Sequence, residues 1–241
     1  MTENVELTIC GVKGGEVYYG QTINWTVRQS IVSKLDSWYP TYDTDVAMKQ
    51  RCDLLASMLI YGDEAQKLFN SENTNLPTAG LDKYQTLIDN INAKTPEMGT
   101  YPALDETGMK ATVSTFGMML QEKVKLYGNF KIKSANFTQL EDYRVEIQHV
   151  KGDGTVLPYT INSDALTVSG NSTKYIMFTF DKLAANNLRD DLVITLYQGE
   201  EAVSVTVTRS ADMIASTLLG SYPTLIPAIM NYADCAKVYF G

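Results

Sequence analysis

Apolar and polar residues along this chain follow two different periods. In some segments apolar residues recur every three or four positions, which predicts helices. The predicted helices cover residues 30–38, 45–69, 81–92, 210–219 and 224–240. From Ala111 to Thr208 the period becomes two, as in Tyr143, Val145 and Ile147, and this alternation predicts short strands. Residues 5–27 alternate as well and predict a two-stranded ribbon.

The two ends of the chain resemble each other in sequence, in the same order. The matching blocks are Val5–Ile9 with Leu192–Leu196, Ile23–Ser30 with Val203–Ser210, Tyr39–Thr41 with Tyr222–Thr224, and Leu54–Phe69 with Leu225–Phe240. The first copy carries an insertion, Tyr42 to Asp53. A self-match in fixed order indicates a repeated structural unit.

These patterns together predict an α+β fold. We expect an antiparallel β-sandwich flanked by repeated helix hairpins, with an N-terminal β-ribbon that belongs to a preceding repeat. The predicted organisation is a ribbon and helix bundle over 1–93, a linker rich in Pro and Gly over 94–110, and a sandwich with the last helix pair over 111–241. A chain that starts with the end of one repeat is expected to continue upstream in a tandem array.

Composition narrows the classes of function. The formal net charge is −8, with lysines and arginines scattered singly, so neither nucleic acid nor membrane insertion is expected. No apolar run approaches the ~20 residues of a membrane span, and no segment has the pattern of a signal peptide. The three cysteines, Cys10, Cys52 and Cys235, lie in apolar patterns and are expected to be buried thiols without an internal disulfide.

Candidate chemistry is sparse. The single histidine, His149, ends an apolar row of a predicted strand and has no partner at metal-ligand spacing, so it is interpreted as a strand residue. Lys151–Gly154 is typical of a hairpin turn. No Gly-x-Ser-x-Gly elbow and no Gly-rich phosphate loop occurs. We therefore expect no enzyme, no cofactor and no metal; a glycosidase pair of carboxylates is not singled out by any pattern.

Three ordered segments resemble a known family. They are the strand Tyr175–Phe180 (YIMFTF), the segment Leu183–Tyr197, and the helix Leu54–Asn70 (LLASMLIYGDEAQKLFN), which is followed by Asn75, Leu76 and Leu81. This order is similar to that of the repeated tail modules of large secreted or wall-attached proteins of gut Firmicutes. The YGAAAQ core of the family's helix differs in both copies here, which suits packing residues. The resemblance implies an extracellular or cell-wall attached, non-catalytic module of a larger exported protein.

The expected function is recognition of a host or neighbouring macromolecule, with an antibody as the candidate in the manner of superantigen-like immunoglobulin binders. The alternatives are a carbohydrate-binding module or a structural spacer in an adhesin stalk. The candidate protein-binding residues are aromatic: Trp38, Tyr39 and Tyr42 at the turn between the first two helices, and Tyr18 and Tyr19 in the ribbon. A packing role for Trp38 and Tyr39 is the competing interpretation.

Overall fold

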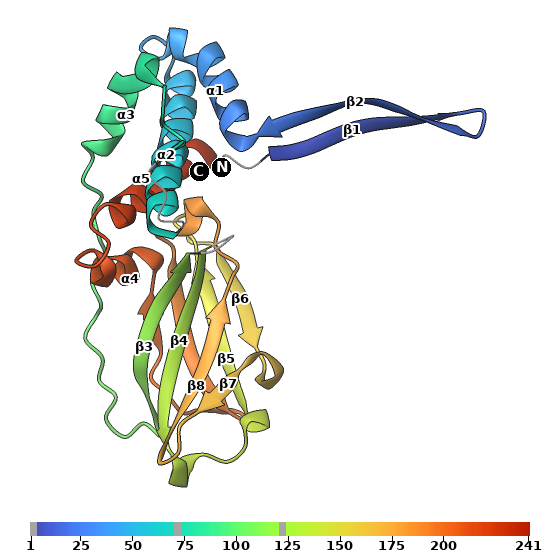
Figure 1. Cartoon of the computed structure of the whole chain (residues 1–241). Coiled ribbons are helices and arrows are strands. Elements are labelled where there is room, and N and C mark those ends of the chain that lie inside the picture. Colours follow the sequence, from blue (N-terminus) through green and yellow to red (C-terminus); the bar gives the residue numbers. More distant parts are fainter. Residues whose placement is uncertain (1–3, 70–73, 121–123) are drawn as a thin grey trace. The chain divides into compact units, whose positions relative to one another are not determined.

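The computed structural model describes residues 4–69, 74–120 and 124–241, and within the ribbon it describes the backbone pairing but not every side chain (Figure 1). Two compact units divide these residues. Unit 1 comprises Met1–Pro96 with Pro227–Gly241, and unit 2 comprises Glu97–Ile226. The chain therefore leaves unit 1, builds unit 2 and returns.

Unit 2 contains two antiparallel sheets, so the predicted α+β fold with antiparallel sheets is confirmed. The first sheet has the order β10-β9-β5-β6, with β11 also paired to β9, and the second has the order β3-β4-β8-β7. The strands are β3 Ala111–Leu120, β4 Val124–Lys133, β5 Tyr143–Val150, β6 Val156–Ile161, β7 Thr167–Ser169, β8 Thr173–Phe180, β9 Asp191–Gln198, β10 Glu201–Ala202 and β11 Val207–Arg209. The sheets meet where Tyr159 of β6 packs edge-on against Phe180 of β8, with ring centroids 5.1 Å apart.

The core of unit 2 follows from the period of two in its strands. Alternate residues of β5 are buried, because the pleat sends successive side chains to opposite faces, and in β9 Leu192, Ile194 and Leu196 are buried together with Thr195. The turn between β5 and β6 is closed by hydrogen bonds that Gly154 N donates to Lys151 O (2.9 Å) and Lys151 N donates to Thr155 O (2.8 Å). This is the predicted hairpin, and Gly154 supplies its left-handed backbone at φ 84°.

Unit 1 consists of helices and an isolated ribbon. The ribbon pairs β1 Asn4–Lys13 with β2 Glu16–Thr26. The helices are α1 Val27–Trp38, α2 Val46–Phe69 and α3 Gln85–Asn92, joined by most of α5 Leu225–Phe240; α4 Ala211–Leu218 lies in unit 2. Short 3-10 helices lie between these elements, at 39–41, 82–84, 134–136, 140–142, 163–165 and 185–187.

Local chemistry explains where the helices start. Thr26 caps α1 in a reciprocal capping box with Gln29: Gln29 N donates to Thr26 Oγ1 (2.9 Å) and Thr26 N donates to Gln29 Oε1 (2.7 Å). Asp45 accepts from the backbone N–H groups of Ala47 (2.8 Å) and Met48 (3.2 Å) and so caps the start of α2.

The last helix lies in a different unit from the one that the predicted boundaries imply. Asn231 Nδ2 donates to the carbonyl oxygens of Ile91 and Lys94, both at 3.2 Å, and the ring of Tyr232 stacks on Tyr61 with centroids 6.0 Å apart. These contacts tie α5 to α3 and α2, whereas the sequence pattern assigns the helix to the second repeat. Tyr61 and Tyr232 are equivalent residues of the matching blocks, so the two copies touch at the same position.

The ribbon and unit 2 share a strand register. Val5, Glu6 and Leu7 of β1 pair with Trp25, Asn24 and Ile23 of β2. In unit 2, Leu192, Val193 and Ile194 of β9 pair with Arg209, Thr208 and Val207 of β11. In each copy a hydroxyl residue, Thr26 or Ser210, then stands at the N-cap of the following helix.

This register corrects the sequence alignment of the second strand. Ile23 corresponds to Val207 and not to Val203, a shift of four residues, because the strand pairing and the helix cap fix the correspondence where a Val/Thr-rich sequence allows two. The repeat and the sandwich with superposable helix hairpins both stay predictions.

A glycine substitution tests the packing of the second sheet. A Cβ on Gly128 of β4 would lie 2.5 Å from Phe178 Cε1 and 2.7 Å from Phe116 Cε1, so Gly128→Ala must displace packed rings. We expect a loss of about 1–3 kcal/mol in the free energy of unfolding and a thermal midpoint lower by roughly 2–10 °C. Gly220→Ala is the matched control, since nothing lies within 4 Å of its Cβ. Equal midpoints in the two variants would contradict this packing.

Candidate functional site

The helix-turn aromatics form a packed cluster. Tyr42 is only 8% exposed, while Trp38 and Tyr39 are half-buried. Tyr39 packs edge-on against Tyr84, with centroids 5.2 Å apart, and lies 5.5 Å from Tyr42. A ring that is buried against its own helices has little surface left for a partner, so the cluster has the geometry of a staple between helices.

Polar contacts fix Tyr42 in place. Its hydroxyl donates to Asp53 Oδ1 (2.8 Å) and accepts from Lys49 Nζ (2.6 Å), whose ammonium also lies 4.1 Å from the ring centroid. Burial and the neighbouring Asp53 carboxylate raise the pKa of Tyr42 well above its usual range. The first and last residues of the insertion, Tyr42 and Asp53, are thus joined by a hydrogen bond.

Trp38 lies between two cations. Lys34 Nζ is 5.6 Å and Arg51 Cζ is 5.2 Å from its ring centroid. Both side chains can lay their apolar stems along the indole and keep their charges in contact with the ring. The Trp38 ring is therefore in contact with two charged side chains on its partly exposed surface.

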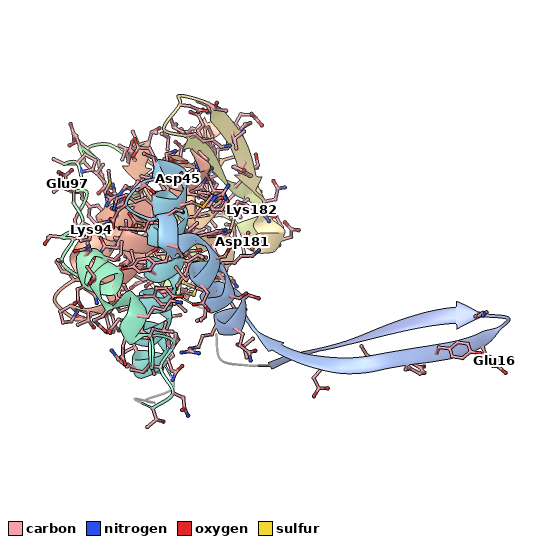
Figure 2. The ribbon with its side chains drawn as sticks, turned by 90° about the horizontal axis from the view of Figure 1, so that it is seen from above. Glu16, Asp45, Lys94, Glu97, Asp181 and Lys182 are labelled. Carbon is pink, nitrogen blue, oxygen red and sulfur yellow. The ribbon has the colours of Figure 1, made fainter. Side chains whose placement is uncertain are left out.

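The ribbon tyrosines are separated from this cluster and from each other. Tyr18 is 54% and Tyr19 is 75% exposed, and the Tyr18 hydroxyl donates to Glu16 Oε2 (3.0 Å) near the ribbon's end, where Glu16 lies (Figure 2). They pair with Gly11 and Cys10 as consecutive residues of β2. Consecutive strand residues point to opposite faces, so the two rings do not form one patch.

His149 is a buried strand residue, as the sequence pattern indicates. Its Nε2 lies 2.8 Å from Asp190 Oδ2, and the side chains are 2% and 3% exposed. Asn187 Nδ2 donates to the same carboxylate oxygen at 2.8 Å. The pair ties β5 to the segment before β9. Sequence reasoning missed Asp190, because no local pattern links a residue 41 positions away.

The described cysteines and acidic residues matter here as possible metal ligands and as possible reactive groups. Within the described ranges no group of His, Cys, Asp and Glu could hold a metal ion, and no described helix has the length and apolarity needed to cross a membrane. Cys52 and Cys235 are buried free thiols, and burial raises the pKa of Cys52 to about 11 and that of Cys235 above its ordinary value. The side chain of Cys10 lies outside the described part of the chain.

Cavities lie at two places among the described residues of unit 1. The larger, about 350 Å³, is lined by Thr26, Arg28, Gln29, Asn75, Leu76 and Ala79. The Arg28 guanidinium donates hydrogen bonds to the carbonyl oxygens of Pro77 (2.8 Å) and Ala79 (2.5 Å). The smaller, about 100 Å³, lies beside Asp53, Lys94 and Cys235, where Lys94 Nζ is 3.8 Å from Asp53 Oδ2. Neither cavity presents a nucleophile with a lowered pKa.

The outer edge of β1 differs from its counterpart in unit 2. There, β9 pairs with β11 on one side and with β5 on the other, through Ile147 with Ile194 and His149 with Leu192. In the described part of the chain, β1 pairs only with β2 (Figure 1). The edge of β1 that corresponds to the β5-paired edge of β9 therefore has no neighbouring strand among the described residues.

Three edge strands of unit 2 carry features that discourage pairing: β6 contains Pro158, β7 has 3 residues and β10 has 2 residues. β1 and β3 each have 10 residues and one register shift, and β2 has 11 residues and no proline. The comparison with β9 therefore selects the continuous stretch from Asn4 to Leu7 of β1 as the candidate functional edge.

Comparisons with known proteins identify no family: no family model and no curated protein matches the chain. Among solved structures it is similar to the alkylpurine DNA glycosylase AlkC of Pseudomonas fluorescens bound to DNA containing an abasic site analog. The TM-score is 0.27 at 10% identity, over 74% of this chain and 51% of that chain. The chain thus spans about half the length of that neighbour.

This neighbour is described as a DNA glycosylase bound to DNA, and three expectations from the sequence conflict with that description. They are the non-catalytic extracellular binding module with its glycan-binding and spacer alternatives, the absence of enzyme activity, and the restriction of partners to proteins or glycans without nucleic acid. These three expectations are withdrawn. A likeness with a TM-score of 0.27 carries neither fold nor activity over to this chain. Export and the family resemblance stay predictions.

Truncating the aromatics distinguishes packing from an exposed role. We expect Tyr42→Ala to lower the free energy of unfolding by about 3–5 kcal/mol, since it removes a buried ring and leaves the Asp53 carboxylate without its donor. Tyr19→Ala, at an exposed position, is the control and should stay within about 0.5 kcal/mol of the wild type. Chemical denaturation measures both, and a Tyr42→Ala midpoint equal to the control would refute the staple.

Thiol labelling tests the burial of the cysteines. In the native Cys10→Ser variant at about pH 8, we expect negligible labelling of Cys52 and Cys235, because a pKa of about 11 for Cys52 leaves little thiolate and burial blocks access. Burial raises the pKa of Cys52 in the folded protein. Its effect on the free energy of unfolding is therefore most favourable below the unfolded pKa of about 8.5, and this favourable effect is lost as the pH rises through about 11. Mass spectrometry that shows rapid native labelling would contradict the burial.

Proposed function

We propose that this chain is a strand-accepting assembly module. The outer edge of β1, from Asn4 to Leu7, pairs with an antiparallel β-strand from outside the described residues and extends the ribbon into a larger sheet. The observation that carries this proposal is that β1–β2 and β9–β11 have the same register. In the described pairings β9 has a further neighbour, β5, whereas β1 has none beyond β2.

The backbone supplies the first part of the binding free energy. An edge strand presents N–H and C=O groups that an incoming strand can satisfy, which is the mode known as β-strand addition. Each hydrogen bond contributes roughly 0.5–1.5 kcal/mol net. A single short strand gains only a few such bonds, so main-chain pairing alone favours weak, reversible association.

Side chains supply the rest. Leu192 and Ile194, buried at 0% and 1% exposure in unit 2, are matched in the ribbon by the apolar residues Val5 and Leu7. A partner that also packs a second layer on this face buries such a row, and full burial of a Val or Leu side chain is worth roughly 1.5–3 kcal/mol. Apolar residues at these positions in a ribbon are consistent with a sheet that is completed on binding.

A peptide-display selection tests strand acceptance for partners of any sequence. Random peptides of about eight residues are selected on the whole chain, and binding is compared with Glu6→Pro and Leu7→Pro. Successive N–H groups of a strand point to opposite edges, so one proline removes a bond to β2 and the other removes a donor at the open edge. We expect peptides with alternating apolar residues that slow hydrogen exchange in β1 and lose at least about tenfold in affinity with the open-edge proline.

The proline variants also control each other. Far-UV circular dichroism and exchange of the β2 amides show which proline leaves the ribbon paired, and that variant is the informative one. Selected peptides that bind both proline variants as tightly as the wild type, or that slow exchange only in unit 2, would overturn the proposal.

A further inference from the structure

Unit 2 has three arginines, and one of them forms no ion pair with a described residue. Arg144 Nε lies 2.9 Å from Glu146 Oε1, and Arg189 Nη1 lies 3.3 Å from Asp212 Oδ2. Arg209 of β11 has no such partner, although its side chain is the most deeply buried of the three, at 3% exposure. An arginine stays charged at any physiological pH, and burying an unpaired charge is unfavourable. The position of this side chain therefore calls for a physical explanation.

The Arg209 guanidinium has unused hydrogen-bond donors. Its hydrogen bond within the described part of the chain runs from Nη1 to the carbonyl oxygen of Thr208 (2.7 Å), and its buried Nε has no acceptor there. Burial lowers the pKa of Arg209, and Tyr101 and Glu106 oppose this fall. The Glu106 Oε1 atom, however, accepts from the backbone N–H of Val113. The guanidinium edge that carries Nε is thus available to an acceptor from outside the described residues.

Aromatic rings lie around this edge. Arg209 Cζ is 4.5 Å from the ring centroid of Tyr101 and 4.9 Å from that of Phe116. The Tyr127 ring covers the neighbouring glycine, since a Cβ on Gly117 would lie 2.2 Å from the Tyr127 hydroxyl oxygen. Burial raises the pKa of Tyr101, Arg209 opposes this rise and Tyr127 adds to it, so the two phenols lie close enough to interact. Neither hydroxyl forms a hydrogen bond with a described residue.

We propose that Arg209, Tyr101 and Tyr127 form a binding site for a carboxylate beside β3. The Nε edge of Arg209 binds the two carboxylate oxygens, the phenol hydroxyls supply further donors, and Phe116 packs against the apolar part of the ligand. A flat carboxylate suits a guanidinium that has rings this close to Cζ, because the two groups bind in one plane through parallel hydrogen bonds. The site does not depend on the strand acceptance proposed above.

The segment 97–106, which we call the strap, controls access to the guanidinium. It contains neither helix nor strand and carries Tyr101, which is 39% exposed (Figure 1). Within the described part of the chain, no backbone–backbone hydrogen bond involves residues 99–104, whereas the start of the strap is held by Arg189 Nη1, which donates to Glu97 O (2.7 Å). Tyr101 can therefore turn away from Arg209 and admit a ligand without the loss of a backbone hydrogen bond.

Titration of the whole chain with carboxylates tests the site. The probes are benzoate and an acetylated alanine dipeptide with a free carboxyl terminus, and their amides are the matched neutral controls. We expect calorimetry to show saturable binding of an acid and at least about tenfold weaker binding of its amide, because hydrogen bonds to charged groups are the stronger ones. Tighter binding of benzoate would assign the site to small acids, and tighter binding of the dipeptide to chain termini. Inorganic phosphate that binds as tightly as the better acid would overturn the assignment to a carboxylate.

Variants separate binding from packing. In Arg209→Met we expect the affinity for the acid to fall at least about tenfold, while the thermal midpoint of the ligand-free protein stays equal or rises, since an unpaired buried charge is removed. Arg144→Met is the matched control, because Arg144 Cζ also lies near a tyrosine ring, 4.7 Å from that of Tyr197, but is paired with Glu146. Its affinity should equal that of the wild type. Tyr101→Phe, which removes one donor, should weaken binding about two- to tenfold.

Three results would overturn the proposal. The first is the absence of saturable binding by either acid up to about 20 mM, which is weaker than ligand recognition requires. The second is an equal affinity in the wild type and Arg209→Met, which would place the acid elsewhere. The third is an unchanged rate of hydrogen exchange in the strap when the acid binds, which would show that the strap does not control access. A lowered midpoint of Arg209→Met without binding by the wild type would make this arginine a purely structural contact.

Discussion

The pairing of β5 with β9 is the interaction on which unit 2 depends. It aligns Val145, Ile147 and His149 with Leu196, Ile194 and Leu192, so that two rows of inward residues are buried together. Because backbone hydrogen bonds alone contribute little net free energy, the register matters chiefly through the side chains it brings into the core. A slip of one residue would turn the apolar row outward and bury Glu146 and Gln148 instead. The His149–Asp190 contact fixes one end of this ladder.

Unit 1 is held by a different kind of contact. Its helices meet through the Tyr61–Tyr232 stack and the two bonds from Asn231 to the end of α3, and the turn after α1 is closed by Tyr42 on Asp53. Burial raises the pKa values of Tyr61 and Tyr232, so both rings keep their protons and pack as neutral groups. Aromatic side chains with one polar end suit this role, since they fill space between helices and still satisfy a buried partner.

Much of the fold is readable from the chain, because periodicity reports burial directly. The helices near 30–38, 45–69 and 81–92, the cap at Asp45 and the turn at Lys151–Gly154 all follow from local rules. The candidate site was harder to predict. The burial of Tyr42 depends on partners 7 and 11 positions away, which sequence spacing does not reveal.

The open edge was invisible for a similar reason. A strand's pattern shows that one face is apolar but not how many neighbours its backbone has. The four-residue correction at Ile23 shows the same limit, since register is a property of the pair and not of either strand. The assignment of α5 to unit 1 likewise depends on Asn231 reaching the end of α3.

The discontinuity of unit 1 affects the order in which the molecule can be built during synthesis. Residues 227–241 reach α2 and α3 only after the ribosome has produced all of unit 2. Until then, the face of α2 around Tyr61 and the carbonyl groups at the end of α3 lack their final neighbours. Unit 2 is a single uninterrupted stretch of chain, so it can close its sheets before unit 1 is complete. Of the two units, the helical one is in this sense the later to mature, although its first residues are made before unit 2.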